Sequence, residues 1–164
     1  MGSRDNVWFY ALALGVLILD QITKAVARGV LQLDKTVTVI PGFFDLKLGY
    51  NMGAVFGILP DWAPLFIIVA LAAVYAIVKL RQAGAQSRAL SVGLGLLLGG
   101  GLGNLVDRLV SGERAVTDFL SFHIAIHGKT YRWPTFNVAD AAIVVGAVCV
   151  MYSVYVVEKR KAAR

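Results

Sequence analysis

Cysteine is almost absent from this sequence, since Cys149 is the only one and lies inside an apolar run. One cysteine excludes a disulfide framework and a thiolate metal cluster within the chain. His123 and His127 have the i, i+4 spacing of a zinc pair. Their neighbours alternate as in a strand, however, and a strand would hold these two side chains about 13 Å apart. No third ligand follows in an HExxH pattern, so we expect no metal and no cofactor.

Charge is scarce as well. Asp, Glu, Lys and Arg make up 16% of the 164 residues, against roughly 25% in soluble domains. Hydrophobic residues make up 58%, and the mean hydropathy is +0.71. Several long runs contain hardly any charge, which is typical of an integral membrane protein, and the length favours one domain over residues 1–164.

The net charge of +6 is concentrated beside the apolar runs rather than on a basic face with interleaved aromatic residues, so nucleic-acid binding is not expected. The 1–6 tail, the 79–88 link and the tail from Glu158 contain only Asp5 and Glu158 as acids. Eight basic residues less these two acids give +6, the whole net charge of the protein: Arg4, Lys79, Arg81, Arg88, Lys159, Arg160, Lys161 and Arg164. Cytoplasmic segments carry such an excess, so both termini are predicted to be cytoplasmic.

Four apolar segments are close to the ~20 residues that a membrane-spanning helix needs. They cover about 7–27, 62–80, 89–109 and 139–157. The first contains Asp20 and Lys24 and is too long and too charged to be a cleaved signal peptide, and no A-x-A site follows.

The two segments on the outer side of the membrane alternate like strands. In residues 28–61, TVTVI (36–40) and FFDLKLGY (43–50) flank a Pro-Gly turn. In residues 110–138, FHIAIHGKTYRWPTF contains His-Gly-Lys between two alternating stretches and predicts a hairpin. We therefore expect a small β element on the outer face of a four-helix bundle.

The third apolar segment is rich in glycine, and Gly95, Gly99 and Gly103 repeat every four residues on one helix face. Small residues at this spacing let helix backbones approach closely in lipid. Two interpretations are compatible: ordinary packing within the bundle, and a groove that leaves room for an incoming helix.

Polar residues lie within or beside these spans, and all gather toward the outer end of the bundle: Asp20, Lys24, Asn104, Asp107, Arg108, Asp118, Asn137 and Asp140. Such residues usually face the protein interior. Each also has a structural explanation. Asn137 and Asp140 have the spacing of a capping box, and Asp118 follows Thr117 at a possible turn. Asp107 and Arg108 could extend their side chains to the headgroups. Asp20 and Lys24 could form a structural ion pair.

Asp118 and Asp140 flank the predicted hairpin and should meet at one depth, between water and hydrocarbon. Two carboxyl groups that share a site do not both ionise readily, so one keeps its proton. The ionised member can then take a proton from water while the protonated member donates to a carbonyl oxygen. This pairing predicts hydrolysis by an aspartic mechanism.

The sequence resembles the lipoprotein signal peptidases (signal peptidase II) of bacterial inner membranes. The resemblance covers the whole chain and is carried, in the family's order, by LDQITK (19–24), YNMGAVFGIL (50–59), GGGLGNLVDRL (99–109), VTDFL (116–120) and FNVADAAI (136–143). Two departures are YNMGAVF, where YNTGAAF is expected, and a hairpin a few residues longer than usual.

The resemblance implies an all-α fold of four transmembrane helices with a small extracytoplasmic β-cradle. It implies an aspartic endopeptidase that removes the signal peptide from prolipoproteins by cutting before a cysteine that carries diacylglycerol. The family's catalytic pair falls on Asp118 and Asp140. Residues that position the substrate or support the dyad fall on Asp20, Lys24, Asn51, Gly53, Asn104, Asp107, Arg108 and Asn137. The expected partners are the prolipoprotein and membrane lipid, and the expected form is a monomer with its active site near the periplasmic face.

Two other classes compete with this hypothesis. A small proton or ion transporter would place its acids at the midplane of the membrane and often contain inverted repeats. A non-enzymatic membrane assembly factor would use the β element as a docking surface, and its function would survive the loss of Asp118 or Asp140.

Overall fold

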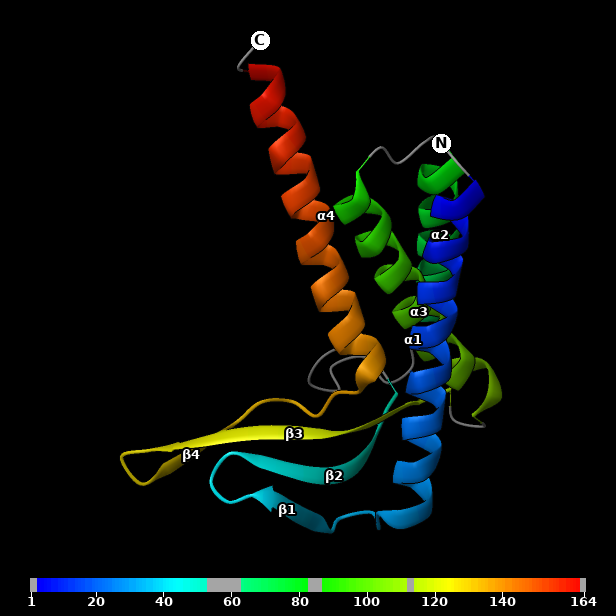
Figure 1. Cartoon of the computed structure of the whole chain (residues 1–164). Coiled ribbons are helices and arrows are strands. Elements are labelled where there is room, and N and C mark those ends of the chain that lie inside the picture. Colours follow the sequence, from blue (N-terminus) through cyan, green and yellow to red (C-terminus); the bar gives the residue numbers. More distant parts are fainter. Residues whose placement is uncertain (1–2, 53–62, 83–86, 112–113, 163–164) are drawn as a thin grey trace.

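The computed structural model describes residues 3–52, 63–82, 87–111 and 114–162. Within these residues, four helices are long and apolar enough to cross a membrane, as predicted. The start of the first and the end of the last lie at the same end of the bundle, and the strands lie at the other end (Figure 1). The helices are α1 (Ser3–Val30), α2 (Ala63–Gln82), α3 (Arg88–Val110) and α4 (Val138–Ala162).

The helix α3 packs against α1 through the glycine face that the sequence indicated. A Cβ on Gly99 would lie 2.5 Å from the carbonyl oxygen of Ala13, and a Cβ on Gly95 would lie 3.2 Å from that of Phe9. Any side chain there would therefore force the two helices apart. The face is covered by α1, so bundle packing is the correct interpretation and an open groove on this face is wrong.

A second face of α3 packs against α4 in the same way. A Cβ on Gly100 would lie 2.5 Å from the carbonyl oxygen of Ala139, and Gly93 faces the carbonyl oxygen of Gly146. The neighbouring Gly101 has open space around it. Close approach on this side brings the N-terminal turn of α4 against the last turns of α3, where the polar residues are.

The strands form one antiparallel sheet in the order β1 (Thr36–Ile40), β2 (Phe44–Asn51), β3 (Val116–Ile126) and β4 (Lys129–Arg132). Both predicted hairpins are confirmed. Their union into a single sheet, through pairing of β2 with β3, was not predicted. In this pairing Gly49 lies opposite Asp118 and Asn51 opposite Val116. The pairing therefore brings Tyr50 and Asn51 of the YNMG motif to the strand that carries Asp118.

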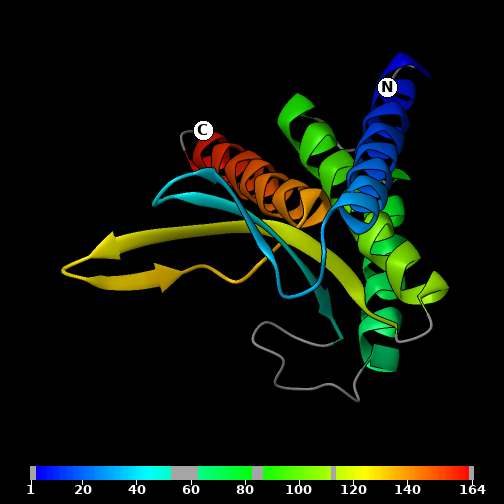
Figure 2. The same ribbon diagram turned by 90° about the horizontal axis from the view of Figure 1, so that it is seen from below.

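The sheet crosses the end of the bundle, and the β3–β4 hairpin projects beyond the helices (Figure 2). A small apolar core joins the two layers, where Ala27 of α1 and Leu31 just after it pack with Leu48 of β2 and Phe119 of β3. Burial of such side chains contributes about 1.5–3 kcal/mol each relative to exposure. This core fixes the start of β3 against the helices, so Asp118 has a defined position.

A polar network crosses three strands of the sheet. The Arg132 guanidinium of β4 donates to Asp45 Oδ2 of β2 and to Ser121 Oγ of β3, each at 2.8 Å. These contacts hold the pKa of Asp45 below its ordinary value, mainly through the hydrogen bond from Arg132. His123 Nδ1 lies 3.3 Å from the same carboxylate. His127 lies apart from His123, in the turn before Gly128.

Candidate active site

The polar residues that the sequence placed at the outer end of the bundle form a buried layer between the helices and the sheet. Among the described residues, Asp20, Lys24, Asp107, Asp118 and Asn137 are at most 3% exposed. Buried polar groups are stable only when hydrogen-bonded or paired. Their partners therefore determine the geometry of the layer.

Lys24 is the centre of an ion cluster. Its Nζ lies 2.8 Å from Asp20 Oδ2 and 3.2 Å from Asp107 Oδ2. The same nitrogen donates to Asn104 Oδ1 at 2.9 Å. Desolvating an ion costs several kcal/mol, which only good geometry and further hydrogen bonds offset. The structural-pair interpretation of Asp20 and Lys24 is supported, and it extends to a third member from α3.

Both carboxylates of the cluster also hold a backbone N–H next to a candidate catalytic residue. Asp20 Oδ1 accepts from the N–H of Ala139 at 2.9 Å, one residue before Asp140. Asp107 Oδ2 accepts from the N–H of Thr117 at 2.8 Å, one residue before Asp118. The acids on α1 and α3 thus position the two segments that carry the aspartates.

Space for this arrangement depends on Gly103 of α3. A Cβ at this position would lie 2.5 Å from Asp20 Oδ2 and 3.2 Å from the Cβ of Ala139. The last glycine of the four-residue repeat therefore leaves room for the Asp20 carboxylate and for the side chain of Ala139 on α4.

Asp118 lies on β3 with both carboxyl oxygens in contact with side-chain amides. Asn137 Nδ2 donates to Oδ1 at 2.8 Å, and Asn51 Nδ2 donates to Oδ2 at 3.3 Å. Burial, together with the nearby charge of Asp140, raises the pKa of Asp118 to about 7, although the two amides and Lys24 act in the opposite direction. A carboxyl group of this kind can hold a proton near neutral pH.

Asp140 lies in the first turn of α4 and forms the predicted capping box with Asn137. Asn137 N donates to Asp140 Oδ2 at 3.1 Å, and Asp140 N donates to Asn137 Oδ1 at 2.9 Å. The other carboxyl oxygen of Asp140 accepts from Asn104 Nδ2 at 2.7 Å. Capping does not separate Asp140 from Asp118, because Asn137 hydrogen-bonds to both.

The remaining candidates differ in how the structure places them. Asn51, Asn104 and Asn137 each donate to one of the two aspartates. Arg108 makes no hydrogen bond to the two aspartates within the described residues, and its guanidinium carbon instead lies over the Phe66 ring, 5.4 Å from the centroid. Gly53 lies outside the described residues.

Two residues of this layer, Gln21 and Arg28, were missed by sequence reasoning. Gln21 Nε2 lies within 3.2 Å of oxygen atoms of Asp20, Gly103 and Asp107. Arg28 donates to Thr117 Oγ1 at 2.9 Å and lies 3.9 Å from Asp107. The signal was present for Gln21, which lies between Asp20 and Lys24 in LDQITK, and for Arg28, one helical turn after Lys24.

The arrangement offers a pair of carboxyl groups for general acid and general base chemistry. Asp118 has a raised pKa, so one member of the pair can hold a proton near neutral pH. A protonated carboxyl group can act as the general acid while its partner acts as the general base. The described residues contain no group of three or more His, Cys, Asp or Glu that could hold a metal ion.

Comparison with known proteins gives relatives for nearly the whole chain. The lipoprotein signal peptidase of Oleidesulfovibrio alaskensis is 44% identical over 151 residues, which cover 89% of this chain and 93% of the relative. That of Geobacter sulfurreducens is 39% identical over 158 residues and covers 94% and 95% of the two chains.

The fold has solved counterparts as well. A bacterial membrane enzyme determined by the in meso method at 2.3 Å resolution matches with a TM-score of 0.79 and 30% identity, over 90% of this chain and 87% of that one. A family profile described as Signal peptidase (SPase) II matches residues 12–156. The extent of these matches shows that the chain belongs to the signal peptidase II family of lipoprotein signal peptidases.

Proposed function

We propose that Asp118 and Asp140 are the catalytic dyad of this aspartic endopeptidase, which removes signal peptides from prolipoproteins. The observation that carries the proposal is Asn137, whose side chain donates to Asp118 and whose backbone N–H donates to Asp140. One residue thus holds both carboxyl groups in a single site. The substrate class follows from family membership, and neither the transporter nor the assembly factor is supported.

The reaction can be written with these groups alone. The Asp140 carboxylate takes a proton from water, and the water oxygen bonds to the carbonyl carbon of the peptide. Asp118 gives its proton to the carbonyl oxygen, which leaves a tetrahedral diol. When the diol collapses, Asp118 recovers a proton from a hydroxyl group, Asp140 passes its proton to the leaving nitrogen, and the C–N bond breaks.

The supporting residues act through position rather than chemistry. Asn104 and Asn51 each donate to one aspartate, and the Lys24 cluster holds the backbone beside both. Arg108 and Gly53 remain candidates for substrate contact. Preorganised groups of this kind reduce the reorganisation needed to reach the transition state.

The proposed setting is the bacterial inner membrane, with both termini cytoplasmic and the dyad near the periplasmic face. Support comes from the excess of Lys and Arg around the helix ends opposite the sheet. The described dyad contacts all lie within one chain, which supports a monomer as the active form. Exposed apolar side chains on the sheet, including Val37, Ile40 and Phe43, offer a surface for membrane lipid.

The proposed cut falls immediately before a cysteine that carries diacylglycerol, and lipid attachment supplies much of the recognition. Each buried CH₂ group contributes ~0.8 kcal/mol, so the burial of about four such groups changes binding by roughly a hundredfold.

The purified protein should cleave a diacylglyceryl-modified precursor at least about a hundredfold faster than the unmodified precursor. A gel-shift assay on the two precursors measures this, with mass spectrometry of the product to locate the cut. Equal rates would remove the lipid requirement, whereas cleavage of neither precursor would count against the function itself.

The pH dependence of cleavage should follow the proton of Asp118. Because its pKa lies at about 7, the dyad keeps one proton below that pH and loses it above. The cleavage rate is therefore expected to fall as the pH rises through about 7, because the proton donor is lost. Initial rates on the lipidated precursor measure the profile. An alkaline limb above about pH 9 would contradict the role of Asp118 as the proton donor.

A further inference from the structure

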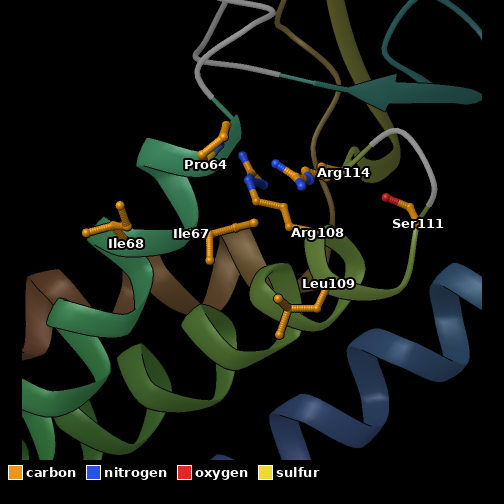
Figure 3. A pocket seen from close by; sticks show the side chains of 7 residues that line it. All are labelled: Pro64, Ile67, Ile68, Arg108, Leu109, Ser111 and Arg114. Carbon is orange, nitrogen blue, oxygen red and sulfur yellow. The ribbon is translucent and has the colours of Figure 1, made fainter.

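A pocket of about 400 Å³ opens where the first turn of α2 meets the last turn of α3. Arg108 and Arg114 converge on it from the α3 side, and Pro64 and Ile67 line it from α2 (Figure 3). The remaining lining residues are Ile68, Leu109 and Ser111. Two guanidinium groups therefore share one opening that is otherwise mostly apolar.

The position of this pocket along the helices places it at a membrane surface. The candidate spans begin at Pro64 in α2 and end at Val110 in α3, so the pocket lies where hydrocarbon gives way to headgroups. Ile68 and Leu109, on the side of the pocket toward the hydrocarbon, are each 62% exposed. The guanidinium groups are thus level with lipid phosphates, and the apolar lining is level with acyl chains.

No carboxylate neutralises the two arginines by direct contact in the described part of the chain. Arg108 stacks on Phe66, and its Nε is buried without a hydrogen-bond partner. Asp107, Asp118 and Asp140 interact electrostatically with Arg108, but none of them forms an ion pair with it in the described residues. Two like charges facing one opening repel each other unless an anion lies between them.

The backbone holds Arg114 toward the pocket at some cost. Its φ is 54°, in the left-handed region that residues other than glycine rarely adopt. Two hydrogen bonds to Ser111 hold this position: Arg114 N donates to its carbonyl oxygen at 3.1 Å, and Ala115 N donates to its Oγ at 2.8 Å. A strained conformation that the surrounding structure maintains is often part of a functional site.

We propose that this pocket binds an anionic glycerophospholipid of the surrounding bilayer, with its phosphate between Arg108 and Arg114 and an acyl chain along Ile68 and Leu109. Arginine forks match phosphate oxygens in a bidentate manner, so a phosphate between the two guanidinium groups can accept hydrogen bonds from both. The proposal concerns a lipid that is not cleaved, and its retention is measured separately from cleavage by the proposed dyad.

The test compares lipid retention by the wild-type protein and Arg114→Gln. Both are purified from nanodiscs that contain phosphatidylglycerol and phosphatidylcholine, and native mass spectrometry counts the lipids that remain bound. The wild type should retain phosphatidylglycerol preferentially. Arg114→Gln should retain about tenfold less, since one charge-assisted hydrogen bond contributes roughly 1.5 kcal/mol or more. Lys129→Gln, which removes an exposed cation from β4, is the matched control and should behave as the wild type does.

Two further arms identify the source of the phosphate. Inorganic phosphate and a short-chain phosphatidylglycerol, each added to the detergent-purified protein, should bind much more weakly than the long-chain lipid. Binding of inorganic phosphate as tight as that of the lipid would overturn the lipid assignment. Equal retention by Arg114→Gln and the wild type would overturn the site. Unchanged retention together with lost cleavage of the lipidated precursor would instead assign Arg114 to substrate binding.

Discussion

Asp118→Asn and Asp140→Asn are each expected to reduce cleavage of a lipidated prolipoprotein by roughly a thousandfold or more. Asparagine keeps the shape of the side chain but can neither take a proton from water nor carry one to the carbonyl oxygen. In the proposed mechanism Asp140→Asn removes the group that takes a proton from water, and Asp118→Asn removes the group that gives a proton to the carbonyl oxygen. Their double variant should therefore lose little more than either single variant, because groups that act as one unit are not additive.

A gel-shift assay with purified protein measures the loss, and Asp34→Asn is the matched control. Asp34 is exposed, lies between α1 and β1, and has a φ of 63° that asparagine tolerates. The control should cleave at the wild-type rate. Retention of full cleavage by Asp118→Asn or Asp140→Asn would eliminate the dyad.

Thermal unfolding separates loss of chemistry from loss of fold. The pKa of Asp118 is raised from 3.8 to about 7, so between these pH values the native state keeps a proton that the unfolded state has released. The contribution of Asp118 to stability is thus fully present below about 3.8 and is lost as the pH rises through about 7. At neutral pH and above, Asp118→Asn should be at least as stable as the wild type while it remains inactive.

Much of the architecture could be predicted from local sequence alone. Membrane spans follow from runs of apolar residues whose length the bilayer sets, and the hairpins follow from alternation around Pro-Gly and His-Gly turns. The capping box was predictable because Asn137 and Asp140 are three residues apart, and its two hydrogen bonds form within one helical turn. These features depend on neighbours in the chain, which the sequence displays directly.

Features that depend on distant partners could not be predicted in the same way. Nothing local to Gly99 indicates that Ala13 of α1, rather than an incoming helix, occupies its face. The pairing of β2 with β3 joins segments separated by the helices α2 and α3, so no turn signal announces it. Arg108 follows Asp107 directly, yet a helix sends consecutive side chains in different directions: Asp107 toward Lys24, Arg108 toward Phe66.

The second large effect is expected at Lys24, which lies at a distance from the reacting atoms in the proposed mechanism. Lys24→Met keeps the length and apolar stem of the side chain but removes the only cation that contacts Asp20 and Asp107 at 3.2 Å or less in the described residues. Breaking a buried ion pair from one side costs about 3–5 kcal/mol, because an unpaired charge stays buried. The variant should therefore unfold at a clearly lower temperature than the wild type.

Cleavage by Lys24→Met should also fall, because the two acids that lose their cation hold the N–H groups of Ala139 and Thr117. Lys35→Met, at an exposed position after α1, is the matched control and should leave both the melting temperature and cleavage unchanged. Adding Asp20→Asn to Lys24→Met removes one unpaired charge, so the double variant should be more stable than Lys24→Met alone. If Lys24→Met had the melting temperature and the cleavage rate of the wild type, Lys24 would not hold the two catalytic segments in place. The contacts of Asp20 with Ala139 N and of Asp107 with Thr117 N would then not depend on the Lys24 charge.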